Sequence, residues 1–166
     1  TKDAVTGIFR AEEDEAPEIA ANDPLSLQNK PDSISPEVFV ANGQLWESTG
    51  DFGKAMESYT KALESEANNA PALTSIARLH FRQGNHPKAA EFFQKAITQS
   101  PSDAGLHNDL GLTLNKMGQR AAATQSLEKA LELAPGTSRY ANNLASVKYE
   151  AGDANGAYQV LSSSNK

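Results

Sequence analysis

The chain has 166 residues, of which 39% are hydrophobic and 22% charged, which is enough apolar material for one globular domain or a short repeat array and excludes disorder throughout. It contains no cysteine, so a disulfide framework, a thiolate metal site and a cysteine nucleophile are excluded. Because the net charge is −6 and no apolar run reaches the roughly 18 residues of a membrane span, we expect neither a nucleic-acid partner nor membrane insertion.

Residues 1–35 form an acidic leader with three basic and eight acidic residues, whereas the rest of the chain is nearly neutral. The leader contains four consecutive acids at 12–15 and several prolines, a composition that buries little and interrupts helices. We therefore expect it to be mostly irregular. Residues 3–11 are the exception, because apolar residues four apart, such as Val5 and Phe9, predict a short amphipathic helix there.

From Pro36 onward the sequence repeats with a step of 34 residues, which predicts an array of similar structural units. Glycine or alanine stands at the eighth, twentieth and twenty-seventh positions of the unit in eleven of twelve cases, far more often than the composition of the chain gives by chance. The four units are 36–69, 70–103, 104–137 and 138–166. The alanines at the twentieth position are Ala55, Ala89, Ala123 and Ala157.

Each unit predicts two amphipathic helices. Positions 4, 7, 8 and 11 of the unit are mostly apolar or small, as are positions 20, 24, 27 and 28, and both spacings place the residues on one helical face. A glycine at position 15 lies between the two stripes, where the first helix must stop in a left-handed or open conformation. A single helical hairpin cannot cover its own apolar stripe, so neighbouring units must stack. These glycines are Gly50, Gly84, Gly118 and Gly152.

The pattern resembles the tetratricopeptide repeat family over residues 36–166. The large residues that carry the resemblance include Phe39 and Leu73 at position 4, Trp46, His80 and Leu114 at position 11, Tyr59, Phe93, Leu127 and Leu161 at position 24, and the closing prolines Pro101 and Pro135. The resemblance implies an all-α, right-handed superhelical solenoid of about four helix-turn-helix repeats. Its concave groove would be lined by the first helix of each unit.

Positions 2, 5, 9, 12 and 13 of the unit lie opposite the packed stripe and are expected to face this groove. We predict that they bind an extended, acidic peptide of a protein partner. The cations, which have only neutral neighbours in the second and third units, would bind its acidic groups, and the amides would pair with its backbone. Apolar residues would serve as anchors for its apolar side chains. The candidate binding residues are Arg78, Phe81, Arg82, Asn108, Leu112, Asn115, Lys116, Arg139, Asn142 and Tyr149. Val40 and Gln44 stand where the family's carboxylate-clamp subgroup has Lys and Asn, which argues against binding chaperone tails by that chemistry.

Other interpretations remain open at this point. The chain could be the substrate-docking or assembly domain of a larger enzyme or secretion machine. It could also self-associate, either because residues 1–20 occupy the groove of their own or a neighbouring molecule, or because the last unit lacks a capping helix over Val160 and Leu161 and forms a homodimer.

Catalysis is not expected, and neither is a metal or cofactor. The sequence contains no phosphate-binding glycine loop, no zinc-protease motif and no nucleophile elbow. His80 and His107 fall at packing positions of adjacent units and could approach each other, but a metal site needs further ligands, and we place Asp109 on another face.

Overall fold

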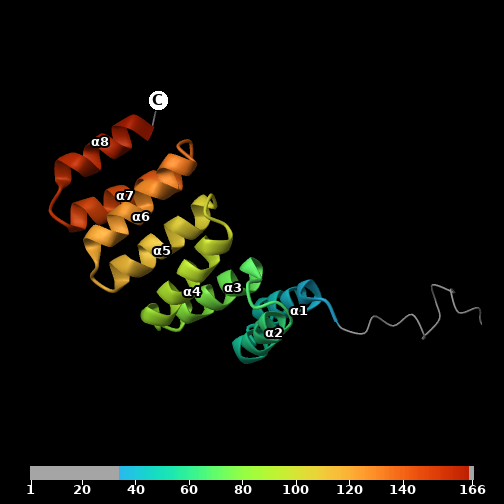
Figure 1. Cartoon of the computed structure of the whole chain (residues 1–166). Helices are drawn as coiled ribbons and strands as arrows, with labels where there is room; N and C mark the ends of the chain where they lie inside the picture. The colour runs from blue at the N-terminus through green and yellow to red at the C-terminus, as the bar shows by residue number, and fades with distance from the viewer. Residues whose placement is uncertain (1–33, 165–166) are drawn as a thin grey trace, which may run out of the picture. The chain divides into compact units, whose positions relative to one another are not determined.

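The computed structural model describes residues 34–164, which form eight helices and no strand (Figure 1). The helices are α1 (Pro36–Ser48), α2 (Phe52–Ser65), α3 (Ala70–Arg82), α4 (His86–Gln99), α5 (Ala104–Lys116), α6 (Arg120–Leu133), α7 (Ser138–Glu150) and α8 (Ala154–Ser164). They pair as four hairpins in chain order, each consisting of an odd-numbered and the following even-numbered helix. The predicted all-α repeat fold is therefore confirmed. Residues 1–33, with the expected short helix at 3–11, lie outside the described residues.

Every first helix ends in the same way. The glycine at position 15 has a φ between 76° and 87° in all four units, a conformation that glycine adopts without steric cost. At the end of α3, the Gly84 N–H donates to the carbonyl of Phe81 at 3.0 Å and the Asn85 N–H donates to that of His80 at 2.9 Å, which is a Schellman motif. The predicted left-handed stop is confirmed, and it turns the chain back into the second helix.

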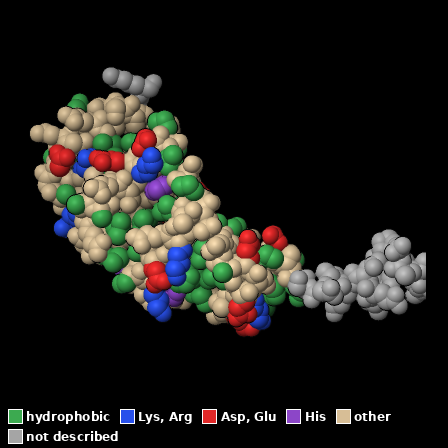
Figure 2. All heavy atoms as spheres, in the orientation of Figure 1, with side chains coloured by type: hydrophobic (Ala, Val, Ile, Leu, Met, Phe, Trp, Pro, Cys, Tyr) green, Lys and Arg blue, Asp and Glu red, His purple; other side chains and the backbone are tan. Residues whose placement is uncertain are grey.

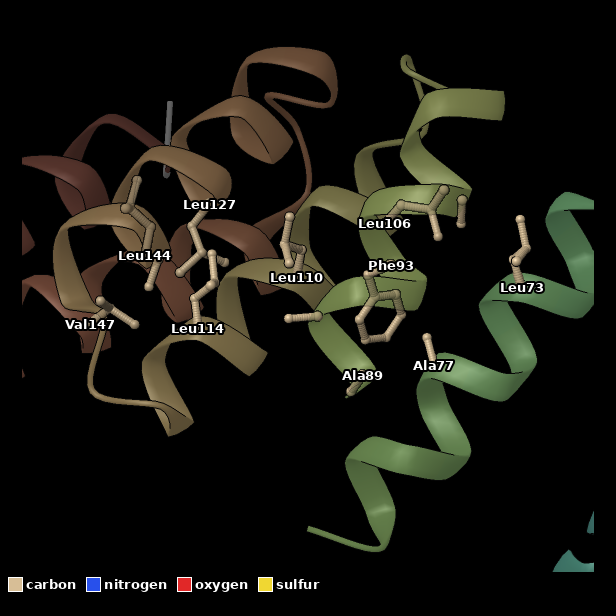
Figure 3. Packing of buried hydrophobic residues seen from close by; sticks show 13 residues of the cluster. Leu73, Ala77, Ala89, Phe93, Leu106, Leu110, Leu114, Leu127, Leu144 and Val147 are labelled. Atoms are coloured by element: carbon tan, nitrogen blue, oxygen red, sulfur yellow. The ribbon is translucent and has the colours of Figure 1, made fainter. Parts of the chain in front are cut away.

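The small residues lie where the helices approach most closely. Ala55, Ala89 and Ala123 have no exposed surface, and the large residues Phe93 and Leu127 are at most 1% exposed. Phe93 and Leu127 belong to one apolar cluster that extends through α3 to α7 (Figure 3). Burying each such large side chain stabilises the fold by about 1.5–3 kcal/mol, so the array is held together by contacts that cross from one hairpin to the next.

The first helix of each later unit is packed on two sides, whereas the sequence pattern predicted one packed stripe. Positions 3 and 10 of the unit are buried as well, because they face the second helix of the preceding unit, and α2 contacts α3, α4 contacts α5 and α6 contacts α7. These extra buried residues are Ala72, Leu106 and Tyr140 at position 3 and Leu79, Thr113 and Val147 at position 10. Position 5, predicted to be free, is buried at Val40 and Asn108.

The apolar side chains at the end of the last hairpin are only partly exposed to solvent. Val160 packs against the main apolar cluster, so the expectation that it lacks cover is wrong. Tyr158 and Leu161 are 72% and 38% exposed. None of the helices in residues 34–164 is long and apolar enough to span a membrane.

The two histidines at packing positions have separate partners. The ring of His80 stacks on Phe92 with centroids 5.7 Å apart, while Nε2 of His107 lies 2.9 Å from the carbonyl oxygen of Pro101. Burial lowers the pKa of His80 below its ordinary value, and the nearby charge of Lys88 lowers it further. Within the part of the chain that the structure describes, no group of three or more potential ligands could hold a metal ion.

Close helix packing predicts that Gly111 tolerates no larger residue. A Cβ at Gly111 would lie 2.6 Å from Cγ of Leu127 and 3.1 Å from the carbonyl oxygen of Ala123. We expect Gly111→Ala to lower the free energy of unfolding by about 1–3 kcal/mol, because overpacking outweighs the better helix propensity of alanine. Urea unfolding measures this difference. Gly136→Ala is the matched control, since no atom lies within 4 Å of the added methyl group, and equal urea midpoints for the two variants would contradict the packing described.

Candidate functional site

Polar side chains join the first helices of successive units across one face of the solenoid. We call this surface, formed by α1, α3, α5 and α7, the inner face. Side-chain hydrogen bonds on it connect α1 to α3, α3 to α5 and α5 to α7, and each joins residues 31 or 35 positions apart. The bonds form a ladder that runs from the first unit to the last.

The first rung joins Arg82 of α3 to Glu47 of α1. Nη1 of Arg82 donates to Oε1 of Glu47 at 3.3 Å, and the guanidinium carbon lies 4.2 Å from the ring centroid of Phe52. The other carboxylate oxygen of Glu47 accepts a 2.6 Å hydrogen bond from the hydroxyl of Tyr59. Burial and, to a smaller extent, this hydrogen bond raise the pKa of Tyr59 to about 12, so the phenol stays protonated and holds Glu47 in place.

The second rung joins Arg78 of α3 to Asp109 of α5. Nε and Nη2 of Arg78 both lie 2.9 Å from Oδ2 of Asp109. The expectation that the cations have only neutral neighbours in the second and third units is therefore wrong for Arg78, and the placement of Asp109 on another face is wrong as well. The reason is that position 6, where Asp109 stands, faces the first helix of the preceding unit. Arg82 pairs with an acid of the first unit.

Two further rungs join α5 to α7. Nδ2 of Asn143 donates to Oδ1 of Asn108 at 2.7 Å, and Nδ2 of Asn108 donates to Asp109 at 3.1 Å. Asn108 is 2% exposed and both ends of its amide are engaged, so the prediction that it contacts a ligand is corrected. Nδ2 of Asn115 donates to Glu150 at 3.0 Å, and this hydrogen bond holds the pKa of the Glu150 carboxyl below its usual value.

A pocket lies between α3 and α5, beside the Arg78–Asp109 rung, where one type of bond seen elsewhere in the ladder is missing. Between α1 and α3, and again between α5 and α7, the residue at position 12 of one unit forms a hydrogen bond with the residue at position 13 of the next unit. Between α3 and α5 the residues at these positions are Phe81 and Lys116. An aromatic ring cannot form the bond, and a pocket of about 250 Å³ is present here. It is lined by Arg78, Phe81, Arg82, Phe93, Asp109 and Leu112. This volume is below the 300–1,000 Å³ typical of small-molecule sites and suits a single side chain.

The structure brings four of the predicted residues, Arg78, Phe81, Arg82 and Leu112, to this pocket. Lys116, one turn beyond Leu112 on α5, is exposed and forms no ion pair within residues 34–164.

The remaining candidates, Arg139, Asn142 and Tyr149, are exposed on α7 and do not line the pocket. The guanidinium of Arg139 lies 5.3 Å from the ring centroid of Tyr140. The predicted residues on α7 are thus separate from the pocket between α3 and α5.

Sequence reasoning missed the acids that pair with the arginines and the ring that forms part of the pocket wall. Glu47 and Asp109 neutralise the central cations, and Phe93 reaches the pocket from α4. Figure 2 shows acidic and basic side chains close together on the visible face of the described residues. The signal in the sequence was the recurrence of complementary polar residues 31 or 35 positions apart.

Comparison with known proteins decides the family. Two family models described as tetratricopeptide repeat match the chain, one over residues 41–104 and the other over residues 81–147. The chain belongs to the tetratricopeptide repeat family. No curated protein sequence matches this tetratricopeptide repeat protein.

Solved structures share the fold. A crystal structure of MamA is 22% identical, with a TM-score of 0.73, and the match covers 78% of this chain and 75% of that chain. PilF of Pseudomonas aeruginosa is 24% identical, with a TM-score of 0.68 over 78% of this chain and 61% of that chain. The first TPR of Spaghetti (RPAP3), solved bound to the HSP90 peptide SRMEEVD, is 20% identical, with a TM-score of 0.68 over 71% and 94% of the two chains. At these identities the likeness establishes the fold alone.

The geometry of the first rung predicts that Tyr59 contributes more to the stability of the fold than Arg82 does. Tyr59 is fully buried and donates to a carboxylate, so Tyr59→Phe is expected to lower the free energy of unfolding by about 1.5–3 kcal/mol. Arg82 is half exposed and its ion pair is screened by water, so Arg82→Met should change stability by less than about 1 kcal/mol. Chemical denaturation of both variants tests the order, and a larger loss for Arg82→Met would show that the surface ion pair anchors this rung.

Proposed function

We propose that this chain is a non-catalytic protein-interaction module whose inner face binds an extended peptide. The peptide places one apolar side chain in the pocket beside Phe81 and an acidic side chain near Lys116. Tetratricopeptide repeat proteins are in general non-catalytic interaction modules, which supports the broad assignment. The pocket between α3 and α5, where the bond between positions 12 and 13 is missing, is the observation that carries the finer proposal.

The pocket has the properties of an anchor site. Phe81, Phe93 and Leu112 supply apolar walls, and charged groups of Arg78 and Asp109 stand at the same pocket. Binding energy in peptide recognition concentrates in a few buried apolar or aromatic contacts surrounded by polar groups. A peptide side chain that enters this pocket would cover apolar surface that no rung of the ladder covers.

The proposed acidic preference rests on Lys116 rather than on the arginines. Arg78 and Arg82 already have carboxylate partners, so a ligand carboxylate would have to compete with Asp109 and Glu47. Lys116 forms no ion pair in the described residues, so its ammonium group is available to donate to a ligand carboxylate. Its charge also acts on Glu150, whose carboxyl pKa it helps to lower.

The peptide SRMEEVD in the Spaghetti (RPAP3) structure combines the two kinds of residue that we propose, because it contains Met and Val beside acidic residues. This chain does not carry the residues expected for the carboxylate-clamp chemistry. Val40 stands where a Lys is expected, and it is only 7% exposed. We therefore propose recognition through the pocket beside Phe81 and use SRMEEVD only as a comparison peptide.

Selection from a phage-displayed library of short random linear peptides tests the proposed function. We expect the full chain to enrich sequences with an apolar residue close to Asp or Glu, and Leu112→Arg, which places a charged chain in the pocket, to weaken their binding by at least about 100-fold. Lys116→Glu should weaken it by about tenfold, equivalent to about 1.4 kcal/mol.

Leu161→Arg is the matched control, since Leu161 is exposed on α8 and outside the pocket. Affinities of the enriched peptides and of SRMEEVD can be measured by fluorescence anisotropy. Enriched peptides that bind Leu112→Arg as well as the unmodified chain would show that the pocket is not the anchor site.

A further inference from the structure

The exposed large hydrophobic side chains of residues 34–164 all lie in the first or the last hairpin, or directly before the first. None of the large hydrophobic side chains of α3 to α6 is exposed in this way. Stacking of neighbouring units covers the two central hairpins on both sides, so the outer hairpins show what one missing neighbour leaves uncovered. The exposed residues are Ile34, Val38, Leu45, Tyr149, Tyr158 and Leu161.

α1 presents one half of a joint, by which we mean the contact between a second helix and the first helix of the next unit. Val38 and Leu45, at positions 3 and 10 of the first unit, are 56% and 60% exposed. The residues at these positions of the other units are at most 7% exposed, because they pack against the preceding second helix. The first unit has no such helix within the described residues.

α8 presents the other half of a joint. Leu161 is 38% exposed at position 24, whereas the residues at this position of the other units are at most 1% exposed. Tyr158, at position 21, is 72% exposed, whereas its equivalent Met56 packs against the apolar cluster that contains Ala72 and Leu79 of α3. These two positions of a second helix therefore gain cover from the first helix that follows.

The charge of α8 also indicates an interface. α8 carries no charged residue, although α2, α4 and α6 carry three or four each. Lys and Glu side chains favour exposed positions, and charged residues are depleted at the centre of protein interfaces. The uncharged surface around Tyr158 is thus typical of a helix face that another protein surface covers.

We propose that a second copy of this chain covers both surfaces, with α8 of one molecule packed against α1 of the next. The two surfaces are the complementary halves of one kind of joint, so a single contact between copies covers both. A different protein would have to supply a separate fit for each surface.

The joint between α2 and α3 is the template for this contact. Met56 and Tyr59 of α2 pack in one apolar cluster with Ala72 and Leu79 of α3. A shift by whole repeats places the two exposed residues of α8 on the α2 pair and the two exposed residues of α1 on the α3 pair. Large apolar side chains stand at all four positions of the proposed joint.

Tyr149 of α7 fits the same arrangement. It stands at position 12, where Glu47 of α1 and Asn115 of α5 form hydrogen bonds with the first helix of the next unit. Tyr149 is 70% exposed, and the described residues contain no following unit. In the proposed contact it lies beside Ser48, at position 13 of the second copy, and the inner face continues from one molecule into the next.

The proposed contact is heterologous, because it joins two different surfaces. Every assembly that does not close into a ring keeps one free α1 surface and one free α8 surface, so association continues as the protein concentration rises. None of the four apolar residues lines the pocket beside Phe81. The proposal is therefore independent of peptide binding at the inner face.

Sedimentation equilibrium of the 166-residue chain tests the contact. The average mass should rise above that of the monomer between about 10 µM and about 1 mM. Leu45→Asp and Tyr158→Asp should each give a monomer, because each places a charge in one of the two surfaces. An equimolar mixture of these variants should form a heterodimer that grows no further, because the first keeps an intact α8 and the second an intact α1.

Gln159→Asp is the matched control. It adds the same charge beside Tyr158, but at position 22, which is exposed in all four units, so this variant should associate like the original chain. Circular dichroism establishes that each variant remains helical. The proposal is overturned by an original chain that is still monomeric at about 1 mM, by a single variant that associates as the original chain does, or by a mixture that forms no heterodimer. Association of Leu45→Asp alone would show contact between two α8 surfaces, and association of Tyr158→Asp alone would show contact between two α1 surfaces.

Discussion

The fold depends on the packing of α3, α5 and α7 against two second helices each, their own and that of the preceding unit. Ala89 and Ala123 allow helix backbones to approach, and Phe93 and Leu127 fill the space between successive hairpins. A hairpin alone would leave much of this apolar surface in water. Because burial is completed only by the next unit, stability and shape are properties of the array rather than of a single repeat.

The same stacking creates the candidate site. It sets the first helices side by side, so that residues 31 or 35 positions apart bond across the inner face. These bonds occupy most of the polar groups that a ligand would otherwise use. We propose that recognition uses the pocket beside Phe81 together with Lys116, which forms no ion pair in residues 34–164. Rigid helices hold both groups, which would lower the entropy cost of binding the proposed peptide.

The sequence predicted the fold well because its strongest signals are local and periodic. Gly84 ends a helix and Ala89 permits close packing in any unit of this kind, so their spacing was enough to establish helical hairpins and their stacking. The site was harder to predict. A helical wheel describes one helix, and it placed Asn108 in the groove and Asp109 on another face, because it carries no information about the neighbouring unit. Arg78 was correctly expected to be exposed, but the carboxylate beside it belongs to the next repeat.

Native-state hydrogen exchange, resolved by residue, tests the dependence on stacking most directly. The account predicts the slowest exchange in α4 and α5, which have packed units on both sides, and faster exchange in α8, whose Tyr158 and Leu161 are exposed. Protection should therefore decrease from the centre of the array toward α8. Equal protection in all four hairpins, each opening independently of its neighbours, would contradict the claim that contacts between units stabilise this protein.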